Sequence, residues 1–141
     1  MVRRAAILLL LVIPGLLQSC APDPFYRSHW SSHELPPMYS KGFYQVGWAS
    51  YYGREFHGEP TASGECFDMF GFTAAHTTLP LGARIKVTNL ENGLSVIVRV
   101  NDRGPFVEGC ILDLSYKAAL EIGMDRPGTA MVRIEIVGYV P

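Results

Sequence analysis

Residues 84–100 read RIKVTNLENGLSVIVRV, and this stretch carries the clearest structural signal of the chain. Ile85 and Val87 alternate with polar residues, as expected for a strand with one buried face. Asn92-Gly93 favours a tight turn, and the residues after it form a second run of β-branched side chains. The stretch therefore predicts a β-hairpin.

Further short apolar or β-branched runs, separated by turn residues, occur at residues 45–52, 72–75, 110–114 and 129–139. Ser115 can cap a helix over residues 116–122, which Gly123 would end. Six strands and one short helix in a segment of this size predict a mainly β domain, a small closed barrel. Periodicity does not identify which barrel.

The N-terminus resembles an export signal. Arg3 and Arg4 precede an apolar run over residues 5–17, which is shorter than a helix that spans a bilayer. The leader ends in LQSC at residues 17–20, which resembles the lipobox of bacterial lipoproteins, where the cysteine is lipidated. An ordinary cleaved signal that leaves Cys20 as a free thiol is the alternative.

The chain is accordingly divided into a lipoprotein signal peptide at 1–19, a lipidated Cys20 with a Pro-containing flexible tether through 42, and a barrel domain at 43–141. Ala21 is not acidic, which by the same resemblance favours sorting to the outer membrane, facing the periplasm. Anchoring in the cell membrane is the alternative.

Composition excludes two broad classes. The 141 residues carry a net charge of −1, and without residues 1–19 the 10 basic and 13 acidic groups leave −3. A weakly acidic chain lacks the basic patch that nucleic-acid binding requires. An apolar share of 48% excludes global disorder. A monomer is expected, because few apolar residues lie outside the predicted strands.

The cysteines fit an exported protein. With Cys20 committed to a lipid, Cys66 and Cys110 form an even pair, and we predict a disulfide between them. Two separate thiols are the alternative. A zinc site is disfavoured because the chain contains no Cys-x-x-Cys pair.

Three residues are candidates for chemistry on their own merits. Glu65 and Asp102 are carboxylates in polar, Gly-containing segments, and two carboxylates in different environments are the minimum for cleaving a glycosidic bond. Ordinary turn chemistry explains both segments equally well. His76 is as well explained by a hydrogen-bonded structural histidine, and Asp113 by the start of a helix.

An aromatic cluster near the end of the first predicted strand can stack on sugar rings or fill the core. It comprises Trp48, Tyr51, Tyr52, Phe56 and His57.

Six ordered blocks together resemble the RlpA-like (rare lipoprotein A) family of septal lytic transglycosylases. They are GWASYYG (47–53), FHG (56–58), TASGE (61–65), AAHTTLP (74–80), VTN (87–89) and VNDRGP (100–105). The resemblance implies a double-psi β-barrel, the fold shared with expansins. It also implies peptidoglycan as substrate, particularly glycan strands without stem peptides.

Matching these motifs gives Asp102 the role of general acid, which then acts as base, and gives Glu65 and His76 the roles of a second carboxylate and a neighbouring histidine. Arg103 joins the aromatic cluster as a substrate-binding residue. The muramoyl 6-hydroxyl would attack its own anomeric carbon and leave a 1,6-anhydro end, so neither metal nor cofactor is needed.

The expected function is thus an endolytic peptidoglycan lytic transglycosylase in wall remodelling or daughter-cell separation. A non-catalytic, expansin-like wall-binding or divisome-interaction lipoprotein is the main alternative, because a fold does not fix a function. A metal-dependent hydrolase using His76 with the carboxylates is a third. Cell-division proteins are expected as possible partners, and septal recruitment through the glycan-binding SPOR repeat of longer relatives is not assumed.

Overall fold

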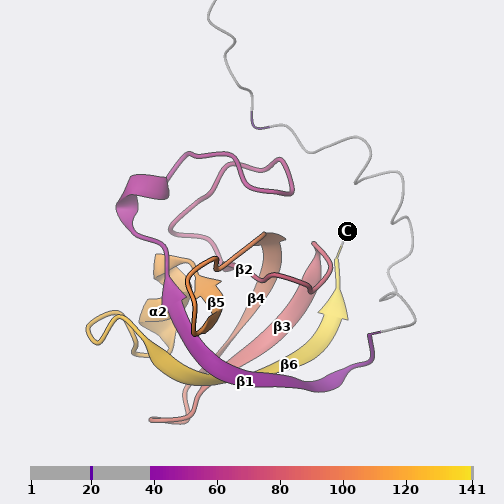
Figure 1. The fold of residues 1–141 in the computed structure, drawn as a ribbon, viewed down its shortest axis with the longest axis vertical. Coiled ribbons are helices and arrows are strands. Elements are labelled where there is room, and N and C mark those ends of the chain that lie inside the picture. Colours follow the sequence, from indigo (N-terminus) through magenta and orange to yellow (C-terminus); the bar gives the residue numbers. More distant parts are fainter. Residues whose placement is uncertain (1–19, 21–38, 141) are drawn as a thin grey trace, which may run out of the picture.

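The structure is a computed structural model that describes Cys20 and residues 39–140 (Figure 1). The leader expected at 1–19 and the tether residues 21–38 lie outside the described residues. Within the described part of the chain, no helix has the length and apolar character needed to cross a membrane.

Six strands, one α-helix and one 3-10 turn make up the domain. They are β1 (Gly42–Tyr51), η1 (Arg54–Phe56), β2 (Thr73–Ala75), β3 (Ala83–Asn89), β4 (Ser95–Asp102), β5 (Cys110–Leu114), α2 (Tyr116–Glu121) and β6 (Ala130–Tyr139). The strands close into a barrel in the order β1-β5-β2-β4-β3-β6. The pairs β1–β5 and β2–β4 run parallel, and the other four pairs antiparallel. The prediction of a mainly β, six-stranded barrel with one short helix is confirmed.

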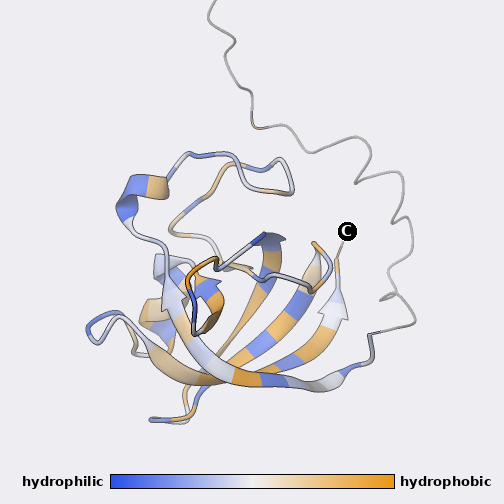
Figure 2. Cartoon of the chain, in the orientation of Figure 1, coloured by the Kyte–Doolittle hydropathy of each residue, from blue (hydrophilic) through white to orange (hydrophobic). Residues whose placement is uncertain are grey.

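The predicted hairpin is formed by β3 and β4, which pair antiparallel. Its loop closes with a hydrogen bond of 2.8 Å from the Asn89 amide to the Leu94 carbonyl, and Gly93 adopts a φ of +76° that a side chain would disfavour. Ile85 and Val87 are fully buried. Figure 2 shows the alternation of apolar and polar residues along β3 and β6, which is how these strands bury one face.

The helix begins and ends where the sequence indicates. The Ser115 hydroxyl accepts a hydrogen bond of 3.2 Å from the Ala118 amide at the N-terminus of α2. Gly123, with a φ of +68°, follows the last turn. Ala118 and Ala119 are fully buried, so the small side chains of α2 pack closely on the barrel.

Two loops border the region where the candidate residues gather. The first, residues 57–72, joins η1 to β2 and lies across one end of the barrel (Figure 1). It is folded on itself, since the Phe67 amide donates to the Glu59 carbonyl at 2.7 Å. The second, residues 103–109, joins β4 to β5.

The predicted Cys66–Cys110 disulfide is wrong. Cys66 is bonded to Cys20, and Cys110 is a free, half-buried cysteine. The parity argument left Cys20 out of the pairing, and Cys20 is the partner of Cys66 in this structure. Register also separates the predicted pair, because Cys110 lies beside Trp48 in the β1–β5 ladder whereas Cys66 bridges to Pro60 inside the 57–72 loop.

Candidate active site

A cavity of about 520 Å³ opens between the two loops and the ends of β1, β4 and β5. Its lining combines aromatic rings, two aspartates, one glutamate and one arginine. The lining residues are Ser50, Tyr51, Tyr52, Phe56, Glu59, Pro60, Phe67, Asp102, Arg103, Gly104, Pro105, Phe106, Val107 and Asp113. A concave site with aromatic walls and a few polar groups suits a sugar chain.

Asp102 is the last residue of β4, not a loop residue, and it faces this cavity. Its Oδ1 accepts hydrogen bonds from the backbone amides of Ala62, at 2.9 Å, and Arg103, at 2.8 Å. The 57–72 loop and the strand end therefore hold the carboxyl in one orientation.

Tyr52 is held in its neutral form. Burial raises the pKa of its hydroxyl, and the negative charges of Asp102 and Asp113 raise it further, as does the hydrogen bond to Asp102. The phenol therefore acts as a hydrogen-bond donor at the cavity.

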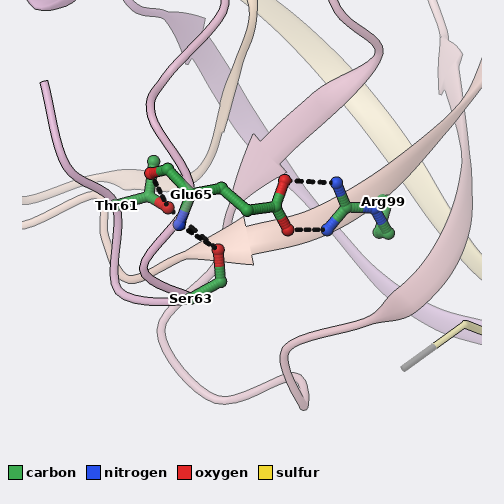
Figure 3. A network of polar contacts seen from close by, with 4 residues as sticks. All are labelled: Thr61, Ser63, Glu65 and Arg99. Carbon is green, nitrogen blue, oxygen red and sulfur yellow. Dashed lines mark hydrogen bonds and ion pairs between the residues drawn. The ribbon is translucent and has the colours of Figure 1, made fainter. Parts of the chain in front are cut away.

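Glu65 does not line the cavity but forms a two-pronged ion pair with Arg99 of β4 (Figure 3). Its oxygens lie 2.6 and 2.7 Å from the two terminal nitrogens of Arg99. The hydrogen bonds from Arg99 lower the pKa of Glu65, outweighing its partial burial. Ser63 reinforces the attachment, because its amide donates to the Asn101 carbonyl at 3.1 Å. Glu65 thus fastens the 57–72 loop to β4.

The Glu65–Arg99 pair is expected to stabilise the domain by about 1 kcal/mol, the upper end for a partly exposed pair with two-pronged geometry. Because the pKa of Glu65 is lowered on folding, this contribution is present above the ordinary glutamate pKa and is lost as the pH falls through the folded-state pKa.

A double-mutant cycle with Glu65→Gln and Arg99→Gln, followed by urea unfolding at pH 7, measures the coupling and cancels the other contacts of Arg99. A coupling energy of zero would contradict the anchoring role of Glu65.

His76 follows β2, and both of its ring nitrogens have partners other than Glu65 and Asp102. Nδ1 accepts hydrogen bonds of 3.1 Å from the amides of Thr78 and Leu79, and Nε2 lies 3.1 Å from Gln45 Oε1. This assigns a neutral ring with its proton on Nε2. Burial, and secondarily the charge of Arg103, lower the pKa of His76 to about 4. The ring orders the 76–79 turn, and its catalytic role stays a prediction.

Arg103 lines the cavity and also braces the turn that contains His76. Its Nη1 donates to the carbonyl of His76 at 3.0 Å and to that of Leu79 at 2.6 Å. The guanidinium therefore ties the end of β4 to the 76–79 turn.

The structure divides the predicted aromatic cluster. Tyr51, Tyr52 and Phe56 line the cavity, whereas Trp48 and His57 do not. His57 Nδ1 accepts a hydrogen bond of 3.1 Å from the Met69 amide, which fixes the 57–72 loop from within. Their substrate-binding roles stay predictions.

Asp113 is the residue that sequence reasoning missed. It was explained as a helix start, but it lies inside β5 and faces the cavity, where it is 9% exposed and accepts a hydrogen bond from the Ser50 hydroxyl. The available signal was a charged residue inside an otherwise apolar strand, since a buried carboxyl is retained only where it has a partner or a task. Phe106, 88% exposed at the cavity rim, was also overlooked.

Among Cys20 and residues 39–140, no three side chains of His, Cys, Asp or Glu converge as a metal site would require. The arrangement that the cavity does offer is three carboxyls, two phenols and an arginine next to apolar rings.

Comparison with known proteins gives a consistent picture. The model of the family described as lytic transglycolase matches residues 44–134. The chain is 58% identical over 97 residues to the endolytic peptidoglycan transglycosylase RlpA of Vibrio cholerae, covering 69% of this chain and 37% of that protein. The protein of the same name from Pseudomonas aeruginosa is 54% identical over 96 residues, covering 68% and 28%. The chain thus spans about a third of the length of the curated relatives it matches.

Among solved structures, the Streptomyces papain inhibitor superposes with a TM-score of 0.52 at 23% identity, covering 67% of this chain and 96% of that one. This similarity concerns the fold alone.

Proposed function

Because this chain belongs to the lytic transglycolase family of double-psi β-barrels, we propose that it cleaves the glycosidic bonds between MurNAc and GlcNAc in peptidoglycan. The cleavage is endolytic, prefers strands without stem peptides, and leaves 1,6-anhydromuramoyl ends. The relatives named endolytic peptidoglycan transglycosylase support the reaction class. The observation that carries the proposal is Asp102, held by two backbone amides at a cavity of a size that accepts sugar rings.

Asp102 is the proton-transferring residue of this reaction. The scissile bond breaks as the glycosidic oxygen gains a proton, and the muramoyl 6-hydroxyl attacks the anomeric carbon and gives up its own proton. Because attack is intramolecular, the reacting atoms are already close, and no water nucleophile has to be held. Tyr52, Phe56 and Arg103 line the cavity through which the glycan strand would pass.

Glu65 and His76 serve this reaction by positioning. Glu65, through Arg99, holds the loop whose Ala62 amide binds Asp102. His76 orders the turn against which Arg103 is braced. Neither side chain has to leave its present partners.

The test is incubation of the purified protein with peptide-free glycan strands, followed by mass spectrometry of the products, beside Asp102→Asn protein. New 1,6-anhydromuramoyl ends made only by the unaltered protein are expected. Reducing ends would show hydrolysis by water and refute the transglycosylase proposal. Binding of glycan without cleavage would favour a wall-binding protein, with the exposed Phe106 at the rim as its first contact.

We also propose that the protein is exported and anchored through a lipid on Cys20 to the outer membrane, facing the periplasm, as a monomer within reach of the division machinery. Export alone already suits the Cys20–Cys66 disulfide. One sulfur cannot carry both a lipid and a disulfide, so lipidation leaves Cys66 as a thiol.

The two chemical states of Cys20 predict different thiol counts. Under denaturing, non-reducing conditions, protein extracted from membranes should show two reactive thiols, Cys66 and Cys110, and the intact mass of a lipidated chain. Protein made with an unlipidated Cys20 should show one, Cys110. Membrane-extracted protein with a single thiol and no lipid mass would refute the anchor.

A further inference from the structure

Four residues form a row across neighbouring strands at the base of the cavity. Ser50 of β1 is paired with Asp113 of β5, Asp113 with Ala75 of β2, and Ala75 with Asp102 of β4. Adjacent strands lie about 4.8 Å apart, so the backbones of the two aspartates are separated by about 10 Å. Both aspartates line the cavity, and the residue between them is only an alanine.

Side chains along β5 alternate between the barrel core and the outside, and this explains why Asp113 faces the cavity. Leu112 and Leu114, on either side, are fully buried in the barrel core. Asp113 therefore faces outward from the core, although only 9% of it is exposed. A carboxyl placed between apolar strand residues costs stability unless it is hydrogen-bonded, and Ser50 supplies one hydrogen bond to Oδ1.

The two aspartates have different surroundings. Asp102 accepts from two backbone amides. Asp113 interacts with the Ser50 hydroxyl and with the charge of Asp102, and its own charge acts on Tyr52. Glu59 and Arg103 are the other charged side chains that line the same cavity. Burial raises the pKa of Asp113, and the Asp102 charge raises it further, while the Ser50 hydrogen bond opposes both. Paired carboxyls in unequal environments are the usual arrangement for an acid and a base.

We propose that Asp113 is a second catalytic carboxyl of this site and donates the proton to the glycosidic oxygen, while Asp102 accepts the proton of the muramoyl 6-hydroxyl. This assignment rests on the proposed function. It gives the two proton transfers of that reaction, to the glycosidic oxygen and from the 6-hydroxyl, to two different residues. The bond from the anomeric carbon to the glycosidic oxygen breaks, and that oxygen takes the Asp113 proton. The bond from the 6-oxygen to the same carbon forms, and its proton goes to Asp102. Proton exchange with solvent in the open cavity then restores both carboxyls.

The decisive variant is Asp113→Asn, which keeps the size of the side chain and an oxygen that can accept from Ser50 but holds no transferable proton. With peptide-free glycan strands, kcat is expected to fall at least about 100-fold, with KM little changed. Glu121→Gln, which removes an exposed carboxyl on α2, is the matched control and should keep the original rate. An Asp113→Asn protein of unchanged kcat overturns the proposal.

A second variant, Ser50→Ala, tests whether Asp113 has a catalytic role or only a structural one. The result does not depend on whether the Asp113→Asn protein folds. Ser50→Ala removes the hydrogen bond that lowers the pKa of Asp113, so the alkaline limb of the pH–rate profile should move to higher pH. A limb that stays in place shows that Asp113 does not supply the proton. If the unaltered protein produces no 1,6-anhydro ends, the proposed function itself fails, which is a different result from an active protein indifferent to both substitutions.

Discussion

The Asp102→Asn variant is expected to lose at least about 100-fold in glycan cleavage, the usual scale for removing a positioned acid or base. Asparagine keeps an oxygen that can accept from the amides of Ala62 and Arg103, so the loop and the strand end should stay in place. Only proton transfer is lost. The loss should therefore appear in kcat, with glycan binding retained.

The measurement is the initial rate of formation of 1,6-anhydromuramoyl ends, with thermal unfolding as a check of the fold. Asp68→Asn is a suitable control. Asp68 lies in the 57–72 loop, and its Oδ1, like that of Asp102, accepts a hydrogen bond from a backbone amide, that of Phe70, at 2.9 Å. The control should cleave at the original rate. Equal rates for Asp102→Asn and the unaltered protein would remove Asp102 from the mechanism.

Acid conditions are expected to destabilise the barrel by about 3 kcal/mol through His76 alone. Its pKa falls from 6.5 in the unfolded chain to about 4 in the folded protein, chiefly because the ring is buried. A lowered histidine pKa means that its contribution is complete above pH 6.5 and is lost as the pH falls toward 4. Each unit of pKa shift corresponds to about 1.4 kcal/mol, so a shift from 6.5 to about 4 gives a loss of about 3 kcal/mol at pH 4.

Comparison with the His76→Gln variant separates the loss of stability due to His76 from the losses due to protonation of Glu65 and the other carboxyls. Urea unfolding at pH 7 and pH 4 gives the free energy of unfolding of each protein. Between these pH values the unaltered protein should lose about 3 kcal/mol more than the variant, which has no titrating ring at this position. Equal losses would show that His76 is protonated in the folded barrel without cost.

Local patterns predicted the strands and the helix well. The hairpin follows from Asn92-Gly93 and the alternation before it, and α2 from Ser115 and Gly123, because such signals act over a few residues. The closure of the barrel is different. It depends on the parallel pairs β1–β5 and β2–β4, whose register no local pattern carries, and the double-psi form was predicted only from family resemblance.

In the candidate site, too, the sequence predicted what is local and missed contacts between distant residues. Motif blocks identified Glu65, His76 and Asp102, but they could not show that Glu65 is bound to Arg99 or that both His76 nitrogens are engaged. Arg99 and Gln45 lie more than 30 residues along the chain from Glu65 and His76, and the bonds to His76 Nδ1 depend on the shape of a turn. The motifs therefore gave candidate residues without their contacts, and of the three only Asp102 lines the cavity.

The sequence by itself determined the secondary structure, the family and the motif that contains Asp102, because these depend on neighbouring residues. Only the tertiary structure decided that Cys66 bonds with Cys20 and that Asp113 joins Asp102 across Ala75. Disulfide partners and facing carboxyls are set by the distance between atoms after folding. Barrel closure brings together residues from four strands, and that proximity does not exist along the chain.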